Sequence, residues 1–234
     1  MSSEEVKLDL DRIVFLGRTF DEYMSMFDLK ERELADRKIL DCPAGACSFT
    51  AKANQMGTDT TAADIAYYHT TEELAEKGRK DLEHAMHELD KVKDNYLWEH
   101  FKSIDDLRKA RVEALTDSTK DRSSAPECYV PVVMPELPFP DQAFDLTLSA
   151  HFLFMYGDRL DYEFHVRALQ ELMRVTREEI RIFPVVDLTC KRYEHLDNLI
   201  EIIVSQDWIV EEIEVPYEFQ KGANHMLKLK RLHT

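Results

Sequence analysis

Apolar residues in this chain follow two spacings, and the alternation between them predicts the order of secondary structure. Short apolar runs typical of buried strands alternate with longer segments in which apolar residues recur every three or four positions, as in helices. The expected strands are 38–42, 60–65, 129–133, 144–153, 180–186, 208–215 and 225–232, and the expected connecting helices are 48–56, a helical segment within 71–121, 160–176 and 192–205.

This order predicts the fold class. Strands that alternate with helices form a parallel sheet, because a parallel connection needs a crossover long enough to hold a helix. No helix is expected between the last two strands, and Gly222 suits the turn between them, so this pair should be antiparallel. We therefore expect an α/β protein: a doubly wound, mostly parallel seven-stranded sheet with a C-terminal antiparallel hairpin and helices on both faces.

Two segments depart from the alternation. Apolar residues at helical spacing in 4–28, with a capping box from Thr19 to Glu22, predict an N-terminal helical cap over residues 1–30. Residues 71–121 are highly charged and without a strand signal, and they are expected to form a helical insert, a pair of helices that lies on the sheet or over a site. Because 234 residues can bury one sizeable core, residues 1–234 are expected to form a single domain.

Candidate chemistry follows three predicted strands, at the edge where open α/β sheets bind ligands. In the tight loop Asp41–Cys47 (D-C-P-A-G-A-C), Gly45 lets the backbone approach a ligand closely. Asp64 follows about 20 residues later, where an acid can accept hydrogen bonds from a ribose. The proline-rich loop Met134–Pro140 is the third segment. Together they favour a nucleotide-type ligand.

The first loop narrows the choice of nucleotide. A dinucleotide fingerprint needs glycines at three set positions, but Pro43 and Cys47 stand where flanking glycines would fall. The chain also lacks the G-K-[ST] of a P-loop. Pyrophosphate binding is therefore disfavoured.

Composition excludes several classes of partner. The 46 acidic and 30 basic residues give a net charge of −16, which opposes nucleic-acid binding through phosphates. No apolar run approaches the roughly 18 residues of a membrane span, and the opening Met-Ser-Ser-Glu-Glu does not resemble a secretory signal. The four cysteines form no C-x-x-C pair and no zinc motif is found. We expect a reduced cytoplasmic protein without a membrane partner or a metal.

Two stretches resemble class I S-adenosylmethionine-dependent methyltransferases. The loop Asp41–Cys47 resembles the D-x-G-x-G-x-G loop of that family, and Leu137–Leu146 (L-P-F-P-D-Q-A-F-D-L) is similar to the L-P-F-P-D-x-x-F-D-L segment before its fourth strand. The order of elements from about residue 30 onward is also similar, including a terminal hairpin that inserts the last strand between two others. The resemblance implies S-adenosyl-L-methionine as cofactor.

The resemblance also implies roles for individual residues. In this family pattern the first loop faces the amino-acid part of the cofactor, the second strand ends at the ribose, and the fourth strand ends beside the sulfonium. The implied contacts are Asp41, Pro43, Ala44 and Gly45 to the amino acid, Asp64 to the ribose, Ile65, Met134, Pro135 and Glu136 to the adenine, Ser149, Ala150 and His151 near the sulfonium, and Arg18, Tyr23 and Met24 near the methionine carboxylate.

Several of these residues also have a structural interpretation. His151 is the candidate general base, because imidazole titrates near neutral pH, but a hydrogen-bonded structural histidine is an alternative. The segment with Arg18 and Tyr23 is equally consistent with a packing helix. Three tyrosines are either part of an acceptor pocket or ordinary packing: Tyr67, Tyr68 and Tyr156.

The sequence thus predicts a class I methyltransferase, an enzyme that transfers a methyl group to a small-molecule acceptor. The alternative is a cofactor-binding or regulatory protein of the same fold without transferase activity. An RNA acceptor is opposed by the net charge of −16.

Overall fold

The computed structural model describes residues 14–232, which form a seven-stranded sheet. The strand order is β3-β2-β1-β4-β5-β7-β6, and β7 lies between β5 and β6, antiparallel to both, while the other pairs are parallel. This confirms the predicted fold class. The strands are β1 (Lys38–Asp41), β2 (Asp59–Asp64), β3 (Tyr129–Pro131), β4 (Phe144–Ala150), β5 (Thr176–Phe183), β6 (Trp208–Glu214) and β7 (His225–Arg231).

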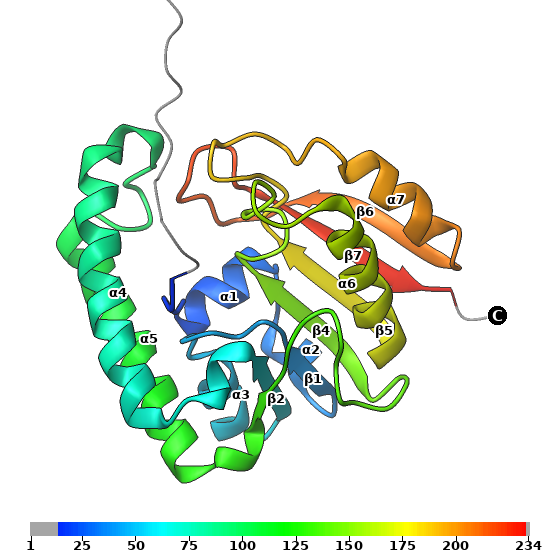
Figure 1. Cartoon of the computed structure of the whole chain (residues 1–234), viewed down its shortest axis with the longest axis horizontal. Helices are drawn as coiled ribbons and strands as arrows, with labels where there is room; N and C mark the ends of the chain where they lie inside the picture. Colours follow the sequence, from blue (N-terminus) through cyan, green and yellow to red (C-terminus); the bar gives the residue numbers. More distant parts are fainter. Residues whose placement is uncertain (1–13, 233–234) are drawn as a thin grey trace, which may run out of the picture.

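Helices cover both faces of the sheet (Figure 1). Successive strand residues point to opposite faces, so Ile39 packs in one hydrophobic cluster and Leu40 in the other. On one side lie α1 (Phe20–Met26), α2 (Glu31–Leu34), α3 (Phe49–Gln55), α4 (Thr71–Lys91) and α5 (Ile104–Ser124), and on the other α6 (Tyr162–Val175) and α7 (Leu196–Val204).

Several strand limits differ from the sequence prediction, with the largest differences at β4 and β5. β4 ends at Ala150 rather than at 153, because the apolar residues that follow are buried in a loop, and an apolar run alone does not distinguish the two. β5 begins at Thr176 rather than at 180. Its first residues are polar, but Thr176 Oγ lies 2.6 Å from Thr147 Oγ on β4, which accounts for the burial of both hydroxyls.

The N-terminal cap differs from the predicted helix. The stripe from Val6 to Ile13 lies outside the described residues, and 14–19 is not helical. α1 has the predicted capping box, in which the Glu22 N–H donates to Thr19 Oγ (3.3 Å) and the Thr19 N–H donates to Glu22 Oε2 (2.9 Å).

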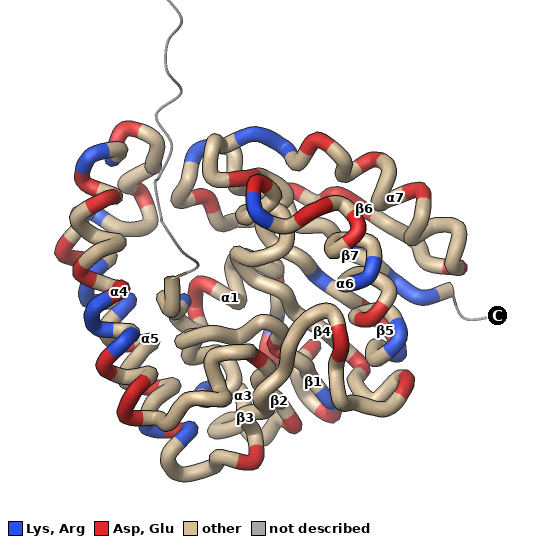
Figure 2. The backbone as a smooth tube through the Cα atoms, in the orientation of Figure 1, with Lys and Arg blue, Asp and Glu red and all other residues tan. Residues whose placement is uncertain are grey.

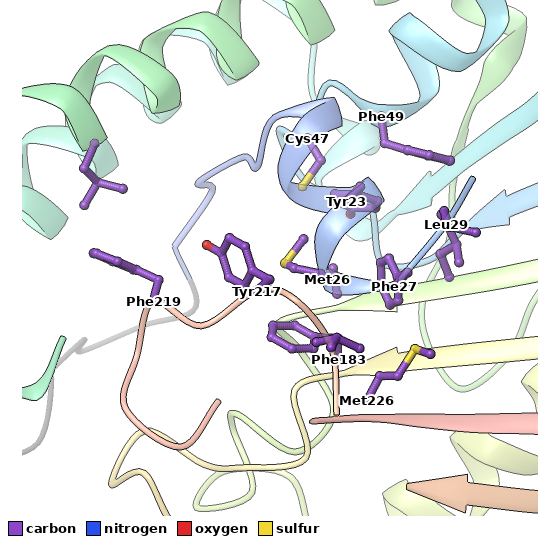
Figure 3. Close-up of a cluster of buried hydrophobic side chains, with 14 of the residues drawn as sticks. Tyr23, Met26, Phe27, Leu29, Cys47, Phe49, Phe183, Tyr217, Phe219 and Met226 are labelled. Atoms are coloured by element: carbon purple, nitrogen blue, oxygen red, sulfur yellow. The ribbon is translucent and has the colours of Figure 1, made fainter. Parts of the chain in front are cut away.

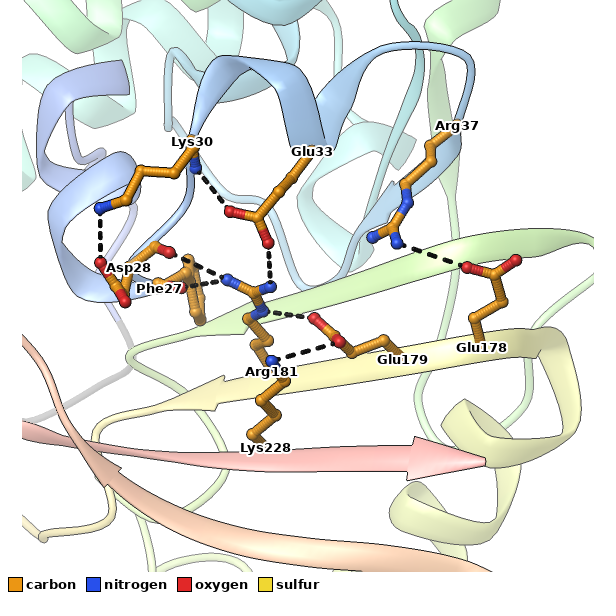
Figure 4. A network of polar contacts seen from close by, with 9 residues as sticks. All are labelled: Phe27, Asp28, Lys30, Glu33, Arg37, Glu178, Glu179, Arg181 and Lys228. Carbon is orange, nitrogen blue, oxygen red and sulfur yellow. Dashed lines mark hydrogen bonds and ion pairs between the residues drawn. The ribbon is translucent and has the colours of Figure 1, made fainter. Parts of the chain in front are cut away.

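A buried arginine fixes α1 and α2 to the sheet (Figure 4). Arg181 on β5 donates to Glu179 Oε1 (2.6 Å), to Glu33 Oε1 (2.9 Å) and to the carbonyl of Phe27 (2.5 Å). Its charge is thereby compensated inside the protein, which burial of a guanidinium requires. The network holds the N-terminal helices beside the strands that carry the candidate site.

The insert consists of α4 and α5, which pack side by side. An added Cβ at Gly78 of α4 would lie 2.6 Å from Leu115 Cδ1 of α5, so a larger residue there would require the Leu115 side chain to move. In Figure 1 the arrows of β4 and β5 point toward the part of the molecule where this helix pair lies, beyond the C-terminal ends of these strands. Charged residues line its outer surface (Figure 2).

Candidate cofactor and acceptor site

The loop after β1 is closed onto β2 by hydrogen bonds. The Gly45 N–H donates to Asp64 Oδ2 (2.8 Å), and Tyr67 Oη donates to the carbonyl of Gly45 (2.9 Å). Gly45 has a φ of +56°, in the left-handed region that favours glycine. A β-carbon there would meet nothing closer than Asp64 Oδ2 at 4.0 Å, so the requirement for glycine is conformational.

Asp64 ends β2 with its carboxylate at the cavity surface. Oδ1 accepts from the Ala66 N–H (2.8 Å) in addition to the Gly45 bond to Oδ2. Burial raises the pKa of Asp64, and the two N–H donors oppose that rise. A carboxylate has about four lone-pair positions, so about two remain for a ligand that carries hydroxyl donors.

Two uncovered apolar side chains flank this carboxylate. Asp64 of β2 pairs with Pro131 of β3, so the residues that follow emerge at the same level. Ile65 is 61% exposed and Val133 is 52% exposed, and both line the cavity. A carboxylate with apolar side chains on both sides suits a ligand in which a ribose is attached to a flat apolar base. Met134 lines the same wall, whereas Pro135 and Glu136 do not line the cavity.

Asp41, by contrast, lies beneath the loop and does not line the cavity. Oδ1 accepts from Tyr23 Oη (3.0 Å), and Oδ2 is buried without a hydrogen bond. Burial raises the pKa of Asp41 well above its usual value, and the Tyr23 bond opposes the rise. Tyr23 is itself fully buried, as in the packing-helix interpretation, and its hydroxyl bonds Asp41 at the start of the first loop.

The end of β4 contributes Ala150 and His151 to the cavity wall. The His151 N–H donates to the carbonyl of Phe183 (2.6 Å), its φ is +52°, and its ring meets Phe183 edge-on at 5.4 Å. Nδ1 is buried without a hydrogen-bond partner among residues 14–232. Burial and the charge of Arg18 lower the pKa of His151 well below its usual value, so the ring is neutral at pH 7. Ser149 is buried behind this wall with its hydroxyl unpaired.

Residues 14–18 form a strap across the cavity. The Phe15 N–H donates to Asp81 Oδ2 on α4 (2.8 Å), and the Arg18 N–H donates to Cys47 Sγ (3.2 Å). At Gly17 an added Cβ would lie 1.9 Å from the carbonyl oxygen of Ala46. The strap therefore touches the first loop, and it brings the side chain of Arg18 into the cavity wall.

The cavity has a volume of about 540 Å³ and two distinct ends. We call the part beside β1, β2 and β3 the loop end, and the opposite part the aromatic end. The loop end is lined by Pro43, Ala44, Gly45, Asp64, Ile65, Val132, Val133 and Met134, and the aromatic end by Met86 and Leu89 of α4, Leu107 and Arg111 of α5, and Tyr96, Phe183, Tyr217 and Phe219.

A buried ion pair holds the segments around the aromatic end together. Arg111 donates to both carboxylate oxygens of Glu22 (2.5 and 2.8 Å), and Tyr217 Oη donates to Glu22 Oε1 (2.8 Å). Burial raises the pKa of Glu22, but the charge and hydrogen bonds of Arg111 outweigh it and lower the pKa to about 2. The pair connects α1, α5 and the segment before β7.

Three other predicted residues have different positions. Tyr156 lines the cavity, Tyr67 is buried and bonded to Gly45, and Tyr68 is exposed. Met24 packs against the core. Sequence reasoning did not find the aromatic end, whose residues are scattered along the chain, although the aromatics at 217 and 219 are a weak signal.

Residues 14–232 contain neither a metal-binding cluster nor a membrane-spanning helix. In that range no group of three or more His, Cys, Asp or Glu side chains is arranged to hold a metal ion. Within the same range, no helix has both the length and the apolar character needed to cross a membrane.

Comparison with a known structure defines the class of fold. The chain matches the crystal structure of magnesium protoporphyrin IX methyltransferase from Synechocystis PCC 6803, solved with bound S-adenosylmethionine. The TM-score is 0.50 at 11% identity, covering 91% of this chain and 78% of that one. The fold is that of the class I S-adenosylmethionine-dependent methyltransferases.

Sequence comparison defines the family. No protein-family model matches the chain. It is 36% identical over 225 residues to uncharacterized protein MJ0045 of Methanocaldococcus jannaschii, covering 96% of this chain and 99% of that protein. The chain belongs to the same family as MJ0045.

Proposed function

We propose that this protein binds S-adenosyl-L-methionine at the loop end and transfers its methyl group to a small molecule. The observation that carries the proposal is the wall on which Asp64 stands between two uncovered apolar side chains, Ile65 and Val133. In a fold shared with methyltransferases, that wall matches the ribose and adenine of the cofactor.

The residues of the loop end fit the parts of this cofactor. Asp64 retains acceptor capacity for two ribose hydroxyls, and Ile65 and Met134 offer apolar surface to the adenine. Ala44 and Gly45 have a small side chain or none, and the side chain of Pro43 is closed into its ring. The amino-acid part of the cofactor can therefore approach the backbone of this loop. Arg18 is the cation available to the cofactor carboxylate: its Nε is buried without a partner among the described residues.

When bound, the cofactor supplies a methyl group on a positively charged sulfur; an acceptor lone pair takes the methyl while the S–C electron pair stays on sulfur. The protein's part is to align the acceptor and to exclude water. The strap and the α4–α5 pair enclose the cavity for that purpose. Ala150 and His151 line it at the end of β4, between the two ends.

Calorimetric titration of the full chain with S-adenosylhomocysteine tests the cofactor assignment. We expect Asp64→Ala to lose at least tenfold in affinity, about 1.4 kcal/mol, because the ribose acceptors are removed. The matched control is Asp59→Ala, the exposed acid that begins the same strand. Circular dichroism verifies folding of both variants, because Asp64 also bonds the first loop. Equal affinity of wild type and Asp64→Ala would contradict the assignment.

A second experiment separates an enzyme from a binding protein. The chain is incubated with methyl-labelled cofactor and, separately, with small-molecule, RNA and protein fractions. We expect label in the small-molecule fraction only, since the strap and the α4–α5 pair border the cavity and the net charge is −16. Cofactor binding without transfer to any fraction would instead identify a binding or regulatory protein.

A further inference from the structure

The aromatic end is lined by closely packed aromatic rings, each 8% exposed or less. Phe219 contacts Tyr96 at 4.8 Å between ring centroids, and Phe183 contacts Tyr217 at 5.8 Å. Figure 3 shows Phe219 extending toward α4 and α5, with Tyr217 and Phe183 behind it. Met86 and Leu89 complete the wall. A flat aromatic ligand gains both burial and edge-to-face contacts there.

The charge of the lining selects against a cation. Within residues 14–232, Asp64 is the one acid that lines the cavity, against three cations: Arg18, Lys77 and Arg111. Arg111 is neutralised by Glu22 and Lys77 by Asp81, so Arg18 contributes the remaining positive charge. An ammonium at the aromatic end would meet the Arg111 guanidinium and no unpaired carboxylate of the described lining, whereas an uncharged hydroxyl compound meets no such repulsion.

His151 stands where the two ends meet. Its backbone is pinned to Phe183, whose ring belongs to the aromatic end, and its imidazole makes no hydrogen bond to any described side chain. Burial lowers the pKa of His151, the charges of Arg18 and Arg111 lower it further and Glu22 opposes them, so the ring is neutral at pH 7. A neutral imidazole accepts a proton from a weak acid.

We propose that the methyl acceptor is a planar aromatic compound with a phenolic hydroxyl, bound at the aromatic end with that hydroxyl at His151. This inference rests on the proposed function. The hydroxyl proton passes to the imidazole of His151, and the oxygen lone pair forms the new O–C bond as the S–C electron pair returns to sulfur. The imidazolium then releases its proton to solvent, so atoms and charges balance.

Three probes of similar size test the substrate class. These are 2-naphthol, the saturated decahydro-2-naphthol and the cation 2-naphthylmethylammonium, each titrated by calorimetry with and without S-adenosylhomocysteine. We expect 2-naphthol to bind at least tenfold more tightly than the other two. Equal or tighter binding of either of the others, or no binding of 2-naphthol to protein that binds S-adenosylhomocysteine, would overturn the inference. Failure of S-adenosylhomocysteine to bind would instead overturn the proposed function.

A variant locates the seat. Phe219→Leu should weaken 2-naphthol several-fold and leave the affinity for S-adenosylhomocysteine unchanged, because that ring lines only the aromatic end. The matched control is Phe139→Leu, a ring that packs edge-on against Phe144 away from the cavity. Unchanged 2-naphthol affinity in Phe219→Leu would place the ring elsewhere.

The proton acceptor has its own readout. His151→Gln should lower the rate of methyl transfer to 2-naphthol by about 10²–10⁴-fold at pH 7, with 2-naphthol affinity retained. Activity should recover at alkaline pH, where the probe ionises without a base. A residue that only supports the fold would give a uniform loss at every pH, and that result would refute the assignment.

Discussion

The two ends of the cavity are held together in different ways. At the loop end, the Asp64 carboxylate accepts hydrogen bonds from residues close in the sequence: Gly45 is 19 positions away and Ala66 is two. At the aromatic end, Glu22 meets Arg111 at 89 positions and Tyr217 at 195. Backbone hydrogen bonds within one strand–loop–helix–strand unit shape the first, and the packing of distant segments shapes the second.

This difference has a consequence for function. The loop end depends on backbone geometry that a fold can keep while its side chains vary. The aromatic end depends on an insert, a strap and a C-terminal segment, each of which can change without disturbing the sheet. Activity and specificity reside in such sites rather than in the fold. Variants that affect one end and spare the other therefore test the division.

The largest effect is expected from Arg111→Met, which leaves Glu22 as an uncompensated buried charge. We expect a loss of about 3–5 kcal/mol in the free energy of unfolding, measured with urea at pH 7. The double variant Glu22→Gln/Arg111→Met should recover part of that loss, because it removes the second charge as well. A single variant as stable as the wild type would show that the pair does not hold the aromatic end together.

The same pair predicts a pH dependence. The pKa of Glu22 is lowered from 4.5 to about 2, so its ionisation stabilises the folded chain fully above about pH 5 and the contribution disappears as pH falls through 2. Arg108→Ala is a suitable control because Arg108 forms an exposed pair with Glu83, and such pairs contribute about 1 kcal/mol or less.

An intermediate effect is expected from Gly17→Ala, at the junction of the two ends. The added Cβ would lie 1.9 Å from the Ala46 oxygen, so the strap or the first loop must move. We expect a loss of about 1–3 kcal/mol in unfolding experiments and weaker binding of S-adenosylhomocysteine. Gly57→Asn is the control: its φ is +90° but no atom lies within 4 Å, and asparagine tolerates positive φ. Unchanged cofactor affinity in Gly17→Ala would separate the strap from the loop end.

The smallest effect concerns His151. Burial keeps its pKa well below 6.5 in the folded chain, so below that pH the unfolded chain binds one more proton and stability falls. His151→Gln should remove up to about 1.4 kcal/mol of this loss per pH unit, measured by urea unfolding between pH 8 and pH 5.5. The exposed His87→Gln should leave the profile unchanged. Identical profiles for all three proteins would show that folding does not lower the pKa of His151.

Most of the fold followed from the sequence, because periodicity and chain order carry it. All seven strands and the antiparallel hairpin were predicted from apolar runs and from the missing last helix. The limits of the strands were not predicted. Thr176–Glu179 is polar and gives no apolar run, but strand pairing with β4 holds it in β5.

The sequence by itself determined the loop end, since Gly45 and Asp64 belong to one continuous unit whose local chemistry is visible as residue types and spacing. Only the tertiary structure decided which residues face them. Arg18 and His151 enter one cavity, and Asp41 with Tyr23 is withdrawn beneath it, because helices α1 and α5 pack around a shared buried ion pair. Contacts between residues that lie 89 or 195 positions apart in the sequence produce no periodic pattern of residue types along the chain.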